Sequence, residues 1–143
     1  MTVKAILSQK GDNVITVEPI CTLADAVRIL SEHRIGALVI VGPDRNVAGI
    51  LSERDIVRAL AKRGPGALNE PVGEVMTRKV VTCAESDTVA ELMERMTQGR
   101  FRHVPVVERG RLLGLVSIGD IVKHRLQEME HESNALKEYI LTA

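Results

Sequence analysis

The stretch GILSERDIV at residues 49–57 has a close counterpart in GLVSIGDIV at residues 114–122. Both contain a glycine in a short apolar run, then Ser-x-x-Asp, then Ile-Val. The correspondence continues upstream, where VIT at 14–16 aligns with VVT at 80–82 and the apolar positions in between also match. Agreement over a whole structural unit, rather than over one loop, indicates an internal repeat. The chain is therefore predicted to contain two copies of one supersecondary unit.

Each copy is predicted to form a strand, a helix, two strands and a second helix. Short apolar runs bounded by turn residues favour buried strands, and apolar residues at 3–4 spacing favour helices. In the first copy the expected strands are 14–17, 37–41 and 47–51, and the expected helices are 22–33 and 52–62. The second copy repeats this order between 80 and 126. The second helix of the first copy is expected to turn Ile56, Val57 and Leu60 inward.

A hydroxyl residue followed three residues later by an acid opens each predicted helix. The pairs are Thr22/Asp25, Ser52/Asp55, Thr88/Glu91 and Ser117/Asp120. In a capping box the hydroxyl accepts a bond from the third helical amide, and the acid accepts one from the cap amide. The sequence thus predicts four capping boxes. The lead-in stretches 3–7 and 72–76 are each expected to form a helical turn before the first strand of a copy.

The last helix is predicted to continue from Asp120 to about residue 141, with an interruption at 131–134. It carries more apolar surface than one copy can cover, at Leu126, Met129, Leu136, Tyr139 and Ile140. Two arrangements are open: packing against another subunit, or folding back on the same chain. We divide the chain into a first copy with its lead-in at 1–66, a second copy at 67–126 and a helical extension at 127–143.

Composition disfavours several classes of function. Lys plus Arg and Asp plus Glu are equal at 19 each, and only 1% of residues are aromatic, so nucleic-acid binding is not expected. Cys21 and Cys83 form no Cys-x-x-Cys pair, which gives no support to a metal site. Residues 1–9 lack the apolar stretch of a signal peptide, and no apolar run is long enough to span a membrane. We expect a reduced, cytoplasmic protein with no membrane segment.

The closing motifs at 49–57 and 114–122 resemble those of CBS (cystathionine-β-synthase) repeats. VMT at 75–77 followed by VVT at 80–82 is similar to the opening of a second CBS repeat, and FRHVPVV at 101–107 is similar to the family's middle strand. The resemblance covers residues 3 to 126. It implies an α/β (α+β) fold in which tandem β-α-β-β-α repeats pack with pseudo-twofold symmetry and leave two related clefts. It also implies a homodimer.

The resemblance further implies that an adenosine ligand binds between the copies: AMP, ADP, ATP, NAD or S-adenosylmethionine. Asp55 and Asp120 would accept hydrogen bonds from ribose hydroxyls. The helix N-termini at Ser52 and Ser117 suit phosphate, because free amides and the helix dipole favour anions. Positions for the base and for close backbone approach are Thr16, Thr82, Gly49 and Gly114. The alternative is that the Ser/Asp pairs are capping boxes and nothing more.

The two copies differ in their charged residues. The second copy carries Arg102 and His103 where the first has Gly36 and Ala37, and Arg100 lies beside them. Two guanidinium groups and an imidazole suit phosphate recognition. Arg54 occurs only in the first closing motif and is a further phosphate candidate. We expect one well-equipped phosphate site, formed by Ser117, Asp120, Arg102 and His103.

These residues favour a regulatory module that senses a nucleotide and signals to a separate, unknown protein partner. The main alternative is a dimeric scaffold protein with the same fold and no ligand. An enzyme is not expected, because no nucleophile lies in a pattern with a base and an orienting group, and no Walker-type loop is present. Nucleic-acid binding through Arg100 and Arg102 is the least favoured hypothesis.

Overall fold

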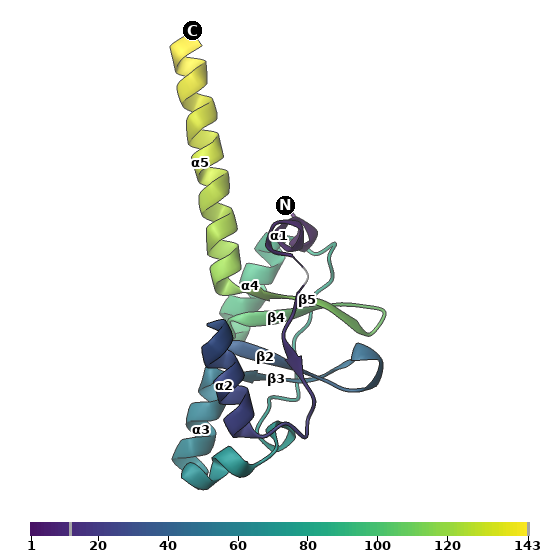
Figure 1. Ribbon diagram of the computed structural model, residues 1–143. Helices are drawn as coiled ribbons and strands as arrows, with labels where there is room; N and C mark the ends of the chain where they lie inside the picture. Colours follow the sequence, from purple (N-terminus) through teal and green to yellow (C-terminus); the bar gives the residue numbers. More distant parts are fainter. Residues whose placement is uncertain (12, 143) are drawn as a thin grey trace.

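Two small sheets form the centre of the molecule, helices pack around them, and one long helix extends away (Figure 1). The computed structural model describes residues 1–11 and 13–142. The first half contains α1 (Val3–Lys10), β1 (Thr16–Val17), α2 (Leu23–His33), β2 (Ala37–Val41), β3 (Val47–Ser52) and α3 (Glu53–Arg63). The second half contains α4 (Val89–Gly99), β4 (His103–Glu108), β5 (Arg111–Ser117) and α5 (Ile118–Thr142). Three short 3-10 helices are η1 (Pro43–Arg45), η2 (Pro65–Asn69) and η3 (Val72–Glu74).

The two sheets have matching registers, which confirms the tandem repeat. In the first sheet β1 pairs parallel with β2, and β2 pairs antiparallel with β3. In the second sheet β4 pairs antiparallel with β5. The register shifts after Ile40 in β2 and after Val106 in β4, which are equivalent positions in the two copies. The mixed α+β architecture that the sequence predicted is therefore present in both halves.

The predicted first strand of the second copy is wrong. Residues 80–82 form no strand, and the only trace of pairing there is a single parallel bridge between Cys83 and Val106. That bridge corresponds to the Val17–Ile40 pair of the first sheet. The strand predicted at 14–17 is also shorter than expected, since β1 covers only two residues. A segment held by one or two ladder pairs barely meets the definition of a strand, so a small difference between the copies removes it.

Each lead-in segment packs on the other copy. Val3, Ile6 and Leu7 of α1 are buried in the core formed by α4, β4, β5 and the start of α5. Val72, which opens η3, is buried in the core of the first copy. The backbone follows the same exchange, because Leu23 N donates to Glu70 O (2.9 Å) and Val89 N donates to Met1 O (3.0 Å). The two copies are thus tied together at both helix starts.

Two of the four predicted capping boxes are complete. Ser52/Asp55 and Ser117/Asp120 form both hydrogen bonds of the box. At α2 and α4 the threonine hydroxyl accepts its amide bond but the acid returns none, so these boxes are half-formed. The prediction that Val57 points inward is also wrong, since its side chain is 65% exposed while Ile56 and Ala59 are buried.

The last helix contains no interruption. α5 runs without a break through 131–134, because His, Glu, Ser and Asn all tolerate a helix and no Gly or Pro stops it. At about 1.5 Å per residue its 25 residues measure roughly 37 Å. Figure 1 shows that most of this helix projects from the body, so it does not fold back on its own chain. None of the helices that the structure describes, α5 included, is both long and apolar enough to cross a membrane.

Candidate functional site

A cleft of about 540 Å³ lies between the start of α3 and the start of β4. This volume is within the roughly 300–1,000 Å³ that small-molecule sites usually have. Residues from both copies line it, so a ligand there would contact both. Its polar and charged lining includes Ser52, Glu53, Arg54, Asp55, Arg58, Thr77, Lys79, Arg100, Arg102 and His103, and its apolar lining includes Ile50, Val80, Val81 and Phe101.

Asp55 lies at the base of this cleft and is only 9% exposed. Its Oδ2 accepts hydrogen bonds from Ser52 N (2.9 Å) and Ser52 Oγ (3.1 Å). Its Oδ1 accepts one from Thr77 Oγ1 (3.0 Å), which comes from the segment that leads into the second copy. An ionised carboxylate offers about four acceptor positions. Asp55 therefore has acceptor capacity left for a ligand hydroxyl, although Thr77 already occupies one side.

The opposite wall of the cleft carries positive charge. Arg100 ends α4 with a left-handed backbone (φ 56°), and the chain then turns into β4 through Phe101 and Arg102. Arg54 Nη1 donates to Arg100 O at 3.4 Å, which links the two walls. In total the lining holds five cationic side chains, namely Arg54, Arg58, Lys79, Arg100 and Arg102, against the two acids Glu53 and Asp55. This excess makes the cleft suitable for an anion.

His103 completes this wall as a neutral donor and acceptor. Burial lowers the pKa of His103, and the nearby Lys10 and Arg102 lower it further, against the opposing effect of Asp120 and Glu53. A Cβ at Gly36 would lie 3.4 Å from the His103 ring, so this ring packs against the residue that precedes β2 in the first copy. An anion placed here would favour the protonated ring.

The expected phosphate site of Ser117, Asp120, Arg102 and His103 stays a prediction, since His103 pairs with Ser117 across β4 and β5 and Asp120 is among the charges near its ring. Arg102 and His103 line the cleft together with Ser52 and Asp55, whereas Ser117 and Asp120 do not line it. The start of β4 thus lies beside the helix starts of both copies, because Ile118 N donates to Arg102 O (2.8 Å) while Arg102 and His103 also line the cleft with Ser52 and Asp55. The second copy contributes Lys79, Arg100, Arg102 and His103 to this cleft, and the first contributes Asp55 together with Arg54 and Arg58.

Asp120 has a different partner. Lys10 Nζ donates to Asp120 Oδ2 (2.7 Å) and to Leu115 O (2.6 Å). Burial alone would raise the pKa of Asp120, but the hydrogen bonds from Lys10 and the Ser117 amide hold it below its ordinary value. The second acid is therefore ionised and already paired with a cation from α1.

The remaining predicted site residues lie outside the cleft. Thr16 pairs with Val39 inside the first sheet, and Thr82 is exposed beside the short bridge of the second copy. The tight approach at the two glycines is made by the chain itself. A Cβ at Gly49 would lie 2.8 Å from Thr77 O, and one at Gly114 would lie 2.7 Å from Leu7 Cδ2.

Sequence reasoning missed Thr77, Lys79 and Arg58, which line the cleft. Lys79 aligns with Asn13 of the first copy, so the difference between the copies at this position was a usable signal. Thr77 belongs to the opening motif that was recognised, but its contact with Asp55 spans 22 residues and no local pattern predicts it.

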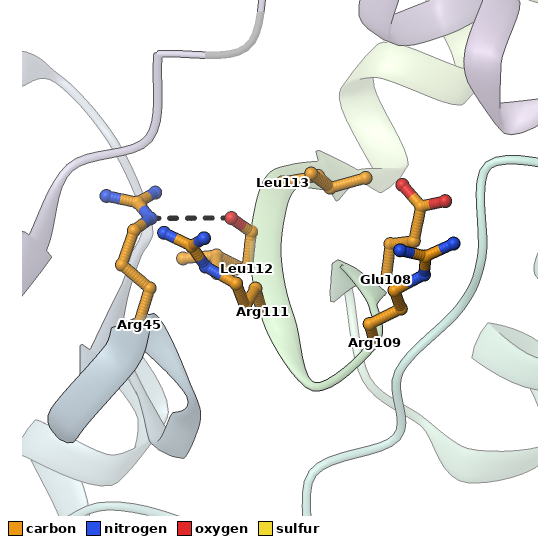
Figure 2. Close-up of a pocket in the computed structure, with 6 residues that line it drawn as sticks. All are labelled: Arg45, Glu108, Arg109, Arg111, Leu112 and Leu113. Atoms are coloured by element: carbon orange, nitrogen blue, oxygen red, sulfur yellow. Dashed lines mark hydrogen bonds between the residues drawn. The ribbon is translucent and has the colours of Figure 1, made fainter.

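Another hollow, of about 410 Å³, lies at the ends of the two β-hairpins (Figure 2). Arg45, Arg109 and Arg111 line it with Glu108, and Arg45 Nε donates to Leu112 O at 3.5 Å. None of the residues predicted for a site lies here. Among residues 1–11 and 13–142, no group of His, Cys, Asp and Glu is arranged to hold a metal ion.

The cleft between two repeats, with Ser-x-x-Asp at a helix start, agrees with a family match. The CBS domain family matches residues 3–62 and 72–127. The chain belongs to this family. It is a tandem CBS pair, and CBS domains are generally regulatory rather than catalytic.

Solved structures share the fold of this CBS pair. A CBS-domain-containing protein from Agrobacterium tumefaciens matches with a TM-score of 0.84 and 48% identity, over 87% of this chain and 99% of that chain. A CBS domain pair in complex with 5′-methylthioadenosine and S-adenosyl-L-methionine matches with a TM-score of 0.80 and 30% identity, over 90% of this chain and 98% of that one.

A curated relative is a mitochondrial CBS domain-containing protein of Arabidopsis thaliana, 37% identical over 123 residues. The match covers 83% of this chain but only 60% of that protein. A 17.7 kDa protein of Acidianus ambivalens is 36% identical, and the match covers 66% of its length. The chain thus spans a little under two thirds of the length of these relatives.

Proposed function

We propose that this CBS pair is a sensor that binds a phosphorylated adenosine ligand in the cleft between Asp55 and Arg102. The observation that carries the proposal is the composition of the cleft, in which an acid at a helix start is accompanied by five cationic side chains from both copies. Asp55 suits the ribose hydroxyls. Arg100, Arg102 and the neutral His103 suit phosphate oxygens. Val80, Val81 and Ile50 offer an apolar surface to the base.

The charge of the cleft argues for one class among the adenosine ligands. A solved relative holds 5′-methylthioadenosine and S-adenosyl-L-methionine, neither of which carries a phosphate and one of which is a sulfonium cation. Five cations against two acids would repel such a cation and attract a phosphate. We therefore expect AMP, ADP, ATP or NAD to bind more tightly here than S-adenosylmethionine.

Signalling would follow from the two-sided nature of the site. A ligand bound to α3 of one copy and to the start of β4 of the other would favour one angle between the repeats. Such a ligand shifts the equilibrium only by its difference in affinity for the two arrangements. The output would pass to a separate protein partner. We propose the cytoplasm as the compartment in which the protein acts.

Catalysis by the free thiol of Cys83 is not part of the proposal. Burial raises the pKa of the Cys83 thiol to about 12, so that thiol is unsuited to act as a nucleophile.

The test is calorimetry on the full chain with AMP, ADP, ATP, NAD and S-adenosylmethionine. Asp55→Asn and Asp120→Asn form a matched pair, because each variant alters the acid of a complete capping box. We expect Asp55→Asn to weaken binding by about tenfold or more, as for loss of a hydrogen bond to a charged group. Asp120→Asn should bind as the wild type does.

Equal losses in both variants would show that binding depends on fold stability, or on the second acid, and would contradict the choice of cleft. If none of the five ligands binds folded protein that has been stripped of endogenous nucleotide, the sensor proposal fails. The dimeric scaffold without a ligand would then be the better description.

A further inference from the structure

α5 has two faces with different surroundings. Its first turns contact the body through Ile121 and His124, which are both buried. The rest of the helix projects from the body (Figure 1). Its other apolar side chains are exposed and have no use in the CBS pair itself.

Those exposed side chains follow a heptad pattern. Val122, Leu126, Met129, Leu136 and Ile140 fall at the alternating 4–3 spacing of coiled-coil core positions, and each is at least 51% exposed. The one polar residue at a core position is Ser133. A seam of this spacing is the geometry of two helices that supercoil around each other. At about 100° of rotation per residue, this seam is centred about 130° around the helix from Ile121 and His124.

The charged residues beside the seam identify the occupant and its direction. In a parallel pair of identical helices, the residue directly before Leu126 or Ser133 on one helix lies beside the residue five places later on the other helix. Arg125 of one copy would then face Glu130 of the other, and Glu132 would face Lys137. Both pairs have opposite charges and each occurs twice in the dimer.

An antiparallel pair with the same core would place like charges together. Its flanking contacts would be Lys123 with Lys137, Glu130 with Glu130, and Glu132 with Glu132. Like charges at these positions oppose association. The sequence beside the seam thus discriminates between the two directions, and it does so through three contacts rather than one.

We propose that α5 pairs with α5 of a second copy as a parallel, in-register, two-stranded coiled coil over residues 122–140. In this arrangement Ser133 meets its own counterpart, and a polar core pair of this kind favours a single register. Both CBS pairs lie at the same end of the coiled coil. The proposal does not depend on the ligand of the cleft, because no residue of the seam lines it.

Cross-linking of the full chain tests the direction. Ile140→Cys in a Cys21→Ser background places a thiol at a core position near one end of the seam, while Cys83 is buried. We expect mild oxidation to give a disulfide-linked homodimer. Glu138→Cys in the same background is the matched control, since position 138 lies on the outer face and should stay uncrosslinked. Failure of Ile140→Cys to link to itself, or selective linking of Ile140→Cys to Val122→Cys, would overturn the proposal.

Charge reversal tests the same geometry without a disulfide. In the parallel dimer Lys137→Glu places a second carboxylate opposite Glu132 at both flanking contacts, so the dimer should weaken by about tenfold in sedimentation equilibrium. Adding Glu132→Lys restores opposite charges and should restore the affinity. In the antiparallel dimer Lys137→Glu would face Lys123 and strengthen association. A stronger dimer, or one that ignores both changes because it forms through the repeats, would overturn the proposal.

Discussion

Gly49→Ala is expected to destabilise the protein more than Gly114→Ala, although the two glycines occupy equivalent positions in the repeat. A Cβ at Gly49 would lie 2.8 Å from Thr77 O and 2.5 Å from Met76 Sδ. The carbonyl cannot withdraw freely, because Ile50 N donates to Thr77 O (3.0 Å) and Thr77 N donates to Ile50 O (2.9 Å). A Cβ at Gly114 would meet only the end of the Leu7 side chain, at 2.7 Å.

The magnitude follows from what has to move. Overpacking a core typically costs about 1–3 kcal/mol. For Gly49→Ala we expect about 2 kcal/mol, since backbone must shift and the bridge to Thr77 must stretch. For Gly114→Ala we expect roughly 0.5–1 kcal/mol, because Leu7 Cδ2 can move by a change of rotamer. At about 3 °C per kcal/mol for a chain of this length, the melting temperatures should fall by about 6 °C and by less than about 3 °C.

Thermal unfolding followed by circular dichroism, with urea titration as a second measure, checks both values. The Gly49 variant should also bind nucleotide more weakly, because the shift of the Thr77 backbone distorts a segment that lines the cleft. Equal stability of Gly49→Ala and the wild type would refute the reasoning. A larger loss for Gly114→Ala than for Gly49→Ala would refute it as well.

Two further predictions concern pH and charge. Burial lowers the pKa of His103, so the folded protein without ligand keeps the ring neutral and loses stability as pH falls below about 6.5. A bound phosphate favours the charged ring. Nucleotide binding should therefore take up protons and become tighter towards about pH 6. Calorimetry in buffers of different ionisation enthalpy measures this proton uptake, and His103→Gln should abolish it. An unchanged uptake in His103→Gln would mean that the phosphate does not bind beside His103. Lys10→Met should cost less than about 1 kcal/mol at about pH 7, because the Lys10 and Asp120 side chains are 34% and 22% exposed. The pKa of Asp120 is lowered in the folded state, so its contribution is present above about pH 3.9 and disappears as the carboxyl is protonated. Urea unfolding should therefore show a smaller difference near about pH 3, and an equal difference at both pH values would contradict the ion pair as its cause.

Local patterns in the sequence were enough to predict the repeat and the helix starts. The start of α3 was found because the Ser52/Asp55 box is formed by residues three apart. The strands β2 and β3 were found because each is a continuous apolar run. Where pairing is minimal, the same logic failed: residues 80–82 have the apolar pattern of 14–16, but the sheet is held there by one bridge at Cys83.

The parts that were not predicted depend on contacts between the copies. No local pattern shows that α1 packs on the second core, because Leu7 and Gly114 are far apart in sequence. For the same reason no local pattern shows that Arg102 and His103 line a cleft with Ser52 and Asp55 of the other copy. Sequence identifies the groups of a site well when one element carries them, and poorly when two elements meet to form it.

The different partners of the two acids explain why equivalent motifs leave the two carboxylates unequally open to a ligand. Asp55 accepts a bond from the Thr77 hydroxyl, whereas Asp120 accepts one from the Lys10 ammonium. A hydroxyl contributes one neutral hydrogen bond, which a ribose hydroxyl can replace with one of similar strength. An ammonium adds the attraction of opposite charges, which a neutral ribose cannot supply. The hydroxyl of Thr77 therefore leaves Asp55 open to a ligand, whereas the ammonium of Lys10 holds Asp120 in the structure of the protein.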